Sequence, residues 1–161
     1  NSDDAEHQRE MRGLEYFYRS WTQDPPERFA LLCMALDAVY DKRGRNTQAI
    51  ADGVRATLGQ HISEKRLFAL LAVRGAVIHG RAPDVYDAQE YASYYDDYDD
   101  DPIEDLSAIA AACFRARILE DVMTEHPDPY AGMTAEMQKK GQWPIRPFVS
   151  SIFTATLPAD Q

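Results

Sequence analysis

The sequence predicts an all-α fold, and three observations support that prediction. Apolar residues recur at helical spacing, most clearly in one segment: Phe29, Leu32, Cys33, Leu36, Val39 and Tyr40. Two Asp-Pro pairs, at Asp24 and Asp101, are typical of helix starts. Gly59 and Gly80 stand where two of the apolar patterns stop, as helix-ending glycines do. With 161 residues, the chain is long enough for one domain with a core. We expect a bundle of four to five helices with an irregular C-terminal extension.

Three helices are expected in the first sixty residues. The first runs from about Ala5 to Trp21 and carries one apolar face: Met11, Leu14, Tyr18 and Trp21. The second follows Asp24-Pro25-Pro26-Glu27, in which Asp24 is the predicted N-cap and Glu27 lies three residues after it. The third ends near Gly59 and has its apolar positions at Ile50, Val54 and Leu58.

The next helices are expected between Ser63 and Met123. Ser63 can cap a fourth helix that ends at Gly80, and its apolar positions are Leu67, Leu70, Leu71, Val77 and Ile78. Four tyrosines at helical spacing indicate a short helix over 91–98. Asp101 then begins a last helix that reaches about Met123. We therefore divide the chain into a helical domain over 1–125 and an extension over 126–161, in which Phe148 to Leu157 alternates weakly, as in a strand or an extended arm.

Composition excludes several classes of protein. No apolar run approaches the roughly 20 residues that span a bilayer. The two cysteines, Cys33 and Cys113, lie inside apolar helical patterns, which indicates buried, reduced thiols and favours a cytoplasmic location. The sequence has no metal-ligand spacing and no phosphate-binding glycine loop, so neither a metal nor a cofactor is expected.

Charge is distributed unevenly along the chain, whose formal net charge is −10. Residues 42–81 hold eight basic residues against two acidic ones, a net of +6, whereas residues 84–105 hold ten acids and no Lys or Arg. The basic segment could face a nucleic acid. The acidic segment is a solvated surface or a contact for a protein partner.

Arg74 is the anomaly of the fourth helix. It continues the series Leu67, Leu70, Leu71 and Val77, so the helix places a charged residue on the buried face. A buried guanidinium is costly unless a counter-charge pairs with it. Asp37, at the margin of the apolar face of the second helix, is the natural candidate. This ion pair is either a purely structural lock between two helices or the support of a functional site.

His79 follows Arg74 after four residues and is followed by Gly80. This spacing resembles the Arg-X4–6-His signature of HEPN domains. The segment Arg-Gly-Ala-Val-Ile-His-Gly, residues 74–80, is similar to the Arg-x-x-Ile/Val-x-His-Gly ending of the Apea-like HEPN group. The segment 28–37, ending in Ala-Leu-Asp, resembles that group's Ala-Leu-Glu helix. The resemblance covers about residues 26–122.

The resemblance implies a homodimeric helical bundle and a metal-independent ribonuclease of the antiviral defence or toxin–antitoxin kind. His79 would move the proton of the ribose 2′-OH, and Arg74 would neutralise the phosphate. The predicted RNA contacts are Lys42, Arg43, Arg45 and Arg81. Five residues along a helix separate two side chains by about 7.5 Å and about 140°. The two groups would therefore meet only if the helix frays at Gly80 or if two protomers bring their motifs together.

A non-catalytic role is the alternative. Position 75 is Gly, where many active members of the group carry Asn, Asp or His. In the alternative, Arg74 is structural, and the domain binds another protein or a small ligand within a larger defence assembly.

Overall fold

The computed structural model describes residues 2–40, 46–59, 62–119, 131–141 and 152–153. Its helices are α1 (Ser2–Ser20), α2 (Pro25–Tyr40), α3 (Asn46–Leu58), α4 (Glu64–Ile78), α5 (Gln89–Tyr98), α6 (Pro102–Phe114) and α7 (Ala131–Lys139). A 3-10 turn, η2 (Val85–Asp87), precedes α5, and a π-helical segment, η3 (Arg115–Leu119), continues α6. In the described part of the chain the only β pairing is an isolated bridge between Ile62 and Phe153. The predicted all-α fold is confirmed.

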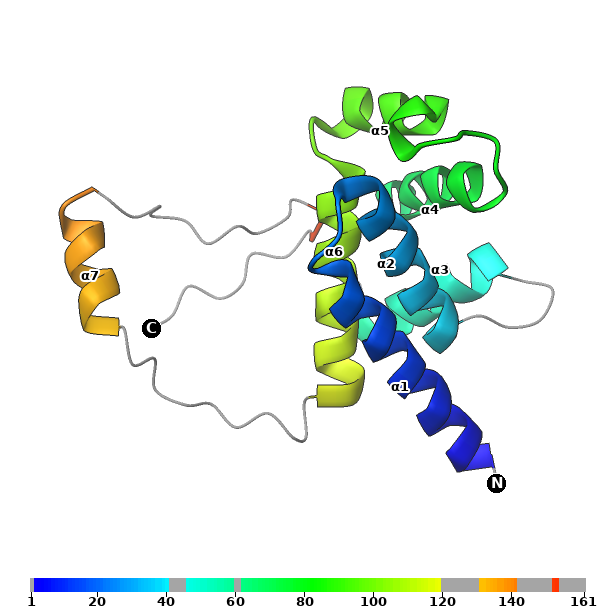
Figure 1. Cartoon of the computed structure of the whole chain (residues 1–161), viewed down its shortest axis with the longest axis horizontal. Coiled ribbons are helices and arrows are strands. Elements are labelled where there is room, and N and C mark those ends of the chain that lie inside the picture. The colour runs from blue at the N-terminus through cyan, green and yellow to red at the C-terminus, as the bar shows by residue number, and fades with distance from the viewer. Residues whose placement is uncertain (1, 41–45, 60–61, 120–130, 142–151, 154–161) are drawn as a thin grey trace.

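The core lies where α2 meets its neighbours. α2 packs against α1, α3, α4 and α6 (Figure 1), and its inward side is fully buried at Phe29, Cys33 and Leu36. The larger buried side chains around it come from α3, α4 and α6: Ile50, Leu67, Leu70, Leu71, Ile103, Leu106 and Ile109. Burial of this apolar surface is the main stabilising contribution to the bundle.

The predicted helix ends are present at four positions. The Ser63 hydroxyl accepts the backbone N–H of Arg66 at 3.4 Å, and the Asp101 carboxylate accepts the N–H of Ile103 at 2.8 Å. Gly59 and Gly80 have φ of 68° and 66°, a left-handed conformation that residues with a Cβ rarely adopt. These local signals explain why α3, α4 and α6 begin or end where the sequence indicates.

Most of the apolar face predicted for α1 does not pack against the bundle. Met11, Tyr18 and Trp21 are 52%, 66% and 59% exposed. The bundle side of α1 instead carries Gly13 and Ser20, both buried. A Cβ at Gly13 would lie 2.8 Å from Val39 Cγ2 and 3.1 Å from the carbonyl oxygen of Ala35, so α1 approaches α2 more closely than a larger residue allows. With Gly13 on the bundle side, Met11 and Tyr18 face outward, whereas Leu14, Tyr16 and Phe17 are partly buried against the core.

Three other expectations need revision. The last long helix is α-helical only to Phe114 and then changes to the π-helical η3, while residues 120–123 lie outside the described part. Ile78, predicted on an apolar face, is 40% exposed. The extension contains a helix, α7, that was not predicted. Figure 1 shows α7 apart from the other helices.

Of the weakly alternating segment 148–157, the structure describes only residues 152 and 153. Ile152 is fully buried, and its carbonyl oxygen accepts the N–H of Ser63 at 3.3 Å. The division at residue 125 stays a prediction. None of the described helices combines the length and apolar character needed to cross a membrane.

Candidate functional site

Arg74 lies inside the bundle, on the buried side of α4. Its side chain is 5% exposed and faces Asp37 of α2, whose side chain is 27% exposed. Nε of Arg74 donates to Oδ1 of Asp37 at 2.9 Å, and Nη2 donates to Oδ2 at 2.5 Å. The pair is therefore bidentate, the geometry in which a guanidinium and a carboxylate match best. It joins two helices that are far apart in the sequence.

This pairing determines what Arg74 can do chemically. One edge of the guanidinium is occupied by Asp37, and the positive charge is balanced within the protein. The Arg74 side of the pair is buried, and burial also raises the pKa of the neighbouring Cys33 thiol well above its ordinary value. A phosphate at the protein surface could not form the same two hydrogen bonds unless Asp37 released them.

His79 lies on the surface at the end of α4. It is the C-cap residue, with φ −90° and ψ 8°, and it is exposed. Its backbone N–H donates to the carbonyl oxygen of Gly75 at 3.3 Å. The structure thus places Arg74 inside the bundle and His79 outside it, and it does not bring the two together within one chain.

The exposed guanidinium at this end of α4 belongs to Arg81. Its side chain is 61% exposed, and its Nη2 lies 3.2 Å from Oε1 of Glu90. A Cβ added at Gly75 would lie 3.6 Å from the same Nη2, so the Arg81 side chain folds back over that glycine. The other three predicted RNA contacts, Lys42, Arg43 and Arg45, lie outside the described residues.

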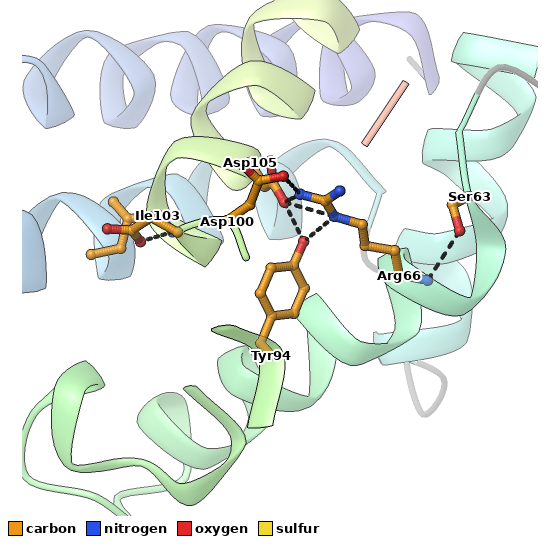
Figure 2. Close-up of polar contacts among 7 residues, drawn as sticks. Ser63, Arg66, Tyr94, Asp100, Ile103 and Asp105 are labelled. Carbon is orange, nitrogen blue, oxygen red and sulfur yellow. Dashed lines mark hydrogen bonds and ion pairs between the residues drawn. The ribbon is translucent and has the colours of Figure 1, made fainter. Parts of the chain in front are cut away.

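A second buried arginine, Arg66, forms a polar cluster that the sequence did not predict (Figure 2). Its side chain is 6% exposed, and its Nε donates to the hydroxyl of Tyr94 and to Oδ2 of Asp105, both at 2.9 Å. Nη2 donates to Asp100 at 2.6 Å and also to Asp105. The Tyr94 hydroxyl in turn donates to Asp105. Burial, and then the bond to Asp105, raises the pKa of Tyr94 well above its ordinary value.

The Arg66 cluster explains two sequence features at once. The guanidinium carbon lies 5.0 Å from the ring centroid of Tyr98 and 5.6 Å from that of Tyr94, so part of the tyrosine stripe packs on a cation. Asp100 and Asp105 supply the counter-charges. The cluster therefore ties α4 to α5 and α6. One signal could have revealed it: Arg66 lies four residues before Leu70 and seven before Val73, on the same buried face.

Most acidic residues of the segment 84–105 cap helices or pair with basic residues of the same chain. Asp84 and Asp101 cap η2 and α6, and Glu90 and Glu104 pair with Arg81 and Arg28. Four exposed acids in this segment have no ion-pair partner among the described residues: Asp87, Asp96, Asp97 and Asp99. The last three lie together at the C-terminal end of α5, where Asp99 adopts a left-handed conformation with φ 53°.

The largest cavity described, about 760 Å³, lies between α1, α2, α3 and η3. Arg117 of η3 lines it, held by Glu6 and Glu10 of α1 and lying over the ring of Tyr40. Three of the charged side chains that line this cavity, Arg117, Glu6 and Glu10, are thus paired with one another. No group of three or more metal-ligating side chains occurs in the described ranges.

No family model matches the chain, and no curated protein or solved structure shows significant similarity to it.

Proposed function

We propose that this domain is a non-catalytic, HEPN-like interaction module that binds a partner protein as part of a larger assembly. One observation supports this over the ribonuclease: the guanidinium of Arg74 is buried and bound through two nitrogens to Asp37. A catalytic arginine must touch the phosphate in the transition state, and Arg74 is engaged elsewhere. Its role in this proposal is to hold α4 against α2.

The partner surface that we propose is the C-terminal end of α5. Asp96 and Asp97 lie in its last turn and Asp99 is its C-cap, and no basic residue is present in that turn. Negative charge there opposes the helix macrodipole at a cost of about 0.3–1 kcal/mol per residue. Residues that lower stability in this way are expected at functional surfaces. Tyr95, 49% exposed, adds an aromatic ring beside them.

The chemistry of this surface selects the partner. Carboxylates and an exposed ring together favour Arg or Lys side chains, through charge-assisted hydrogen bonds and cation–π contacts. The surface would repel RNA phosphates. We therefore propose a basic segment of a protein as the occupant. A cytoplasmic location belongs to the same proposal, because Cys33 and Cys113 are both buried free thiols.

A binding experiment tests the surface. The triple variant Asp96→Asn/Asp97→Asn/Asp99→Asn should bind a labelled Arg-rich peptide at least tenfold more weakly than the wild type, as measured by fluorescence anisotropy at low salt. The control is a triple variant with the same change of net charge elsewhere: Glu27→Gln, Asp52→Asn and Glu136→Gln. Equal weakening in both variants would mean that only the overall charge matters, and the proposed surface would be wrong.

The same α5 variant should be more stable than the wild type. Removing Asp96 and Asp97 from the last turn of α5 relieves their repulsion with the helix dipole, by about 0.6–2 kcal/mol in total. Urea unfolding followed by circular dichroism measures this gain. A loss of binding without a loss of stability would separate a functional surface from a damaged fold.

The ribonuclease is the second candidate, because His79 is exposed and the side chain of Arg81 is 61% exposed. In that candidate, Arg81 rather than Arg74 would contact the phosphate. RNA cleavage in EDTA distinguishes the two candidates. We expect no difference between the wild type, His79→Ala and Arg81→Ala. Cleavage by the wild type that either variant abolishes would establish the ribonuclease and overturn the non-catalytic module.

A further inference from the structure

A groove of about 320 Å³ lies between α4 and α5, which run side by side (Figure 1). Ala69 and Ala72 of α4 line one wall, and Glu90, Ser93 and Asp97 of α5 line the other. The three α5 residues follow one another at intervals of three and four, so they share one side of that helix. The groove therefore combines a wall of small side chains with a wall of hydrogen-bonding oxygens.

This groove is continuous with the proposed partner surface. Asp97 belongs to both, because it lines the groove and lies in the last turn of α5. Glu90 lies seven residues earlier, about 10.5 Å back along the helix. The groove lies at the lower limit of small-molecule pockets, so it fits side chains of a docked segment better than a whole small molecule. Negative charge thus extends from the end of α5 along the groove to the start of that helix.

A guanidinium of the chain itself lies at the Glu90 end of the groove. Nη2 of Arg81 is 3.2 Å from Oε1 of Glu90, and a Cβ at Gly75 would lie 3.6 Å from the same nitrogen. Gly75 follows Ala72 by three residues, so it continues the small-residue wall of α4. Arg81 therefore shows that a guanidinium fits beside Glu90, in space that the missing side chain of Gly75 leaves open.

The end of α4 directs this side chain while leaving it exchangeable. The N–H of Gly80 donates to the carbonyl oxygen of Val77 at 3.0 Å, and the N–H of Arg81 donates to that of Ala76 at 2.9 Å. These are the two hydrogen bonds of a Schellman motif, and they hold the backbone at Arg81. The side chain itself is 61% exposed and that of Glu90 is 32% exposed. An ion pair this exposed contributes little to stability, so another guanidinium can replace Arg81 at a small cost.

We infer that Arg81 is an intramolecular competitor for this groove: an arginine of the basic partner segment displaces it from Glu90, while a second basic residue of that segment pairs with Asp97. The inference rests on the proposed function, because it takes the basic protein segment as the occupant. Basic residues seven positions apart on a helical segment lie on one side, about 10.5 Å from each other along its axis. That separation equals the separation of Glu90 and Asp97 along α5.

A double-mutant cycle tests the displacement. The probe is the labelled Arg-rich peptide, and fluorescence anisotropy at low salt measures its binding to the full chain. Arg81→Ala should bind it about two- to fivefold more tightly than the wild type, because the competitor is gone. Glu90→Gln should bind it about threefold more weakly or worse, because a charge-assisted contact is lost. Adding Arg81→Ala to Glu90→Gln should give no comparable gain, since there is no carboxylate left to release.

Arg19→Ala is the matched control for charge. Its side chain is also 61% exposed and pairs with Glu15 at 3.9 Å, so the substitution removes the same charge and a similar ion pair from α1. Its peptide affinity should stay close to that of the wild type. A gain in Arg19→Ala as large as in Arg81→Ala, or a gain from Arg81→Ala that does not need Glu90, would overturn the inference.

Peptide spacing tests the two-point contact. Of two Ala-rich helical peptides of about 20 residues, one with arginines seven positions apart should bind more tightly than one with arginines five positions apart. Five positions turn the second arginine by about 140°, away from α5. Equal binding of both peptides would exclude simultaneous contact with Glu90 and Asp97.

The outcomes separate this inference from the proposed function. If neither the wild type nor Arg81→Ala binds a basic peptide, both fail. If the wild type binds and the triple variant at Asp96, Asp97 and Asp99 weakens binding, the partner surface stands. An affinity that Arg81→Ala leaves unchanged would then overturn the competitor role alone.

Discussion

Replacing Asp37 with Asn tests the role of Arg74 most directly. The substitution keeps the size of the side chain and removes the carboxylate that accepts two hydrogen bonds from Arg74, at 2.9 Å and 2.5 Å. Breaking a buried ion pair from one side costs about 3–5 kcal/mol, because the remaining charge stays desolvated. Asp37 is 27% exposed and water can approach that side of the pair, so we expect about 3 kcal/mol, at the low end of this range.

Urea unfolding measures this loss. With a slope of about 2 kcal/mol per molar urea, a loss of about 3 kcal/mol lowers the unfolding midpoint by about 1.5 M. The double variant Asp37→Leu/Arg74→Met replaces both charges by apolar groups and should recover most of the stability. As the matched surface control, Arg55→Gln breaks the exposed pair with Glu64, whose atoms lie 2.8 Å apart, and should cost about 1 kcal/mol or less. If Asp37→Asn costs no more than Arg55→Gln, the structural role assigned to Arg74 is wrong.

Three further predictions concern other parts of the bundle. Tyr94→Phe should lower the free energy of unfolding by about 1–3 kcal/mol in chemical denaturation. It removes a hydroxyl that accepts a hydrogen bond from Arg66 and donates one to the buried carboxylate of Asp105. Since the pKa of Tyr94 is raised in the folded state, the unfolded chain loses this proton first as pH rises. Stability should therefore fall above about pH 10, and this extra fall should be absent in Tyr94→Phe. Gly53→Ala should destabilise by about 1–3 kcal/mol or more, since its Cβ would lie 2.2 Å from the ring of Tyr40, and a thermal melt unchanged by this substitution would contradict the packing. The buried Cys113, whose thiol pKa burial raises to about 12, should react with a thiol reagent only as the protein unfolds, and rapid labelling under native conditions would disprove that burial.

The sequence predicted those parts of the fold that depend on local chemistry. Ser63, Asp101 and the two glycines after α3 and α4 act within one turn of chain, so their effects can be read from neighbouring letters. The face of α1 could not be predicted in this way. An apolar stripe shows only that one side of a helix is apolar, and the close contact of Gly13 with α2 decides which side is turned inward.

The candidate site was predictable to a similar degree. Arg74 and Arg66 both stand at buried positions of α4, and the same periodicity that marks the first marks the second. Their partners depend on tertiary structure: Asp37 is 37 residues from Arg74, and Asp105 is 39 residues from Arg66. The spacing between Arg74 and His79 already indicated that their side chains diverge, and the end of α4 at Gly80 places His79 on the surface.

The contact of Ile152 with the start of α4 has a consequence for how the protein can be shortened. A fragment that stopped at residue 125 would keep every helix of the bundle, yet it would remove a fully buried side chain and the carbonyl that accepts the N–H of Ser63. The hole left in the core would cost about 2–4 kcal/mol, as truncating a buried aliphatic side chain does. Expression of the helices alone should therefore give a less stable protein, and a fragment meant to retain the whole core should extend at least through Phe153.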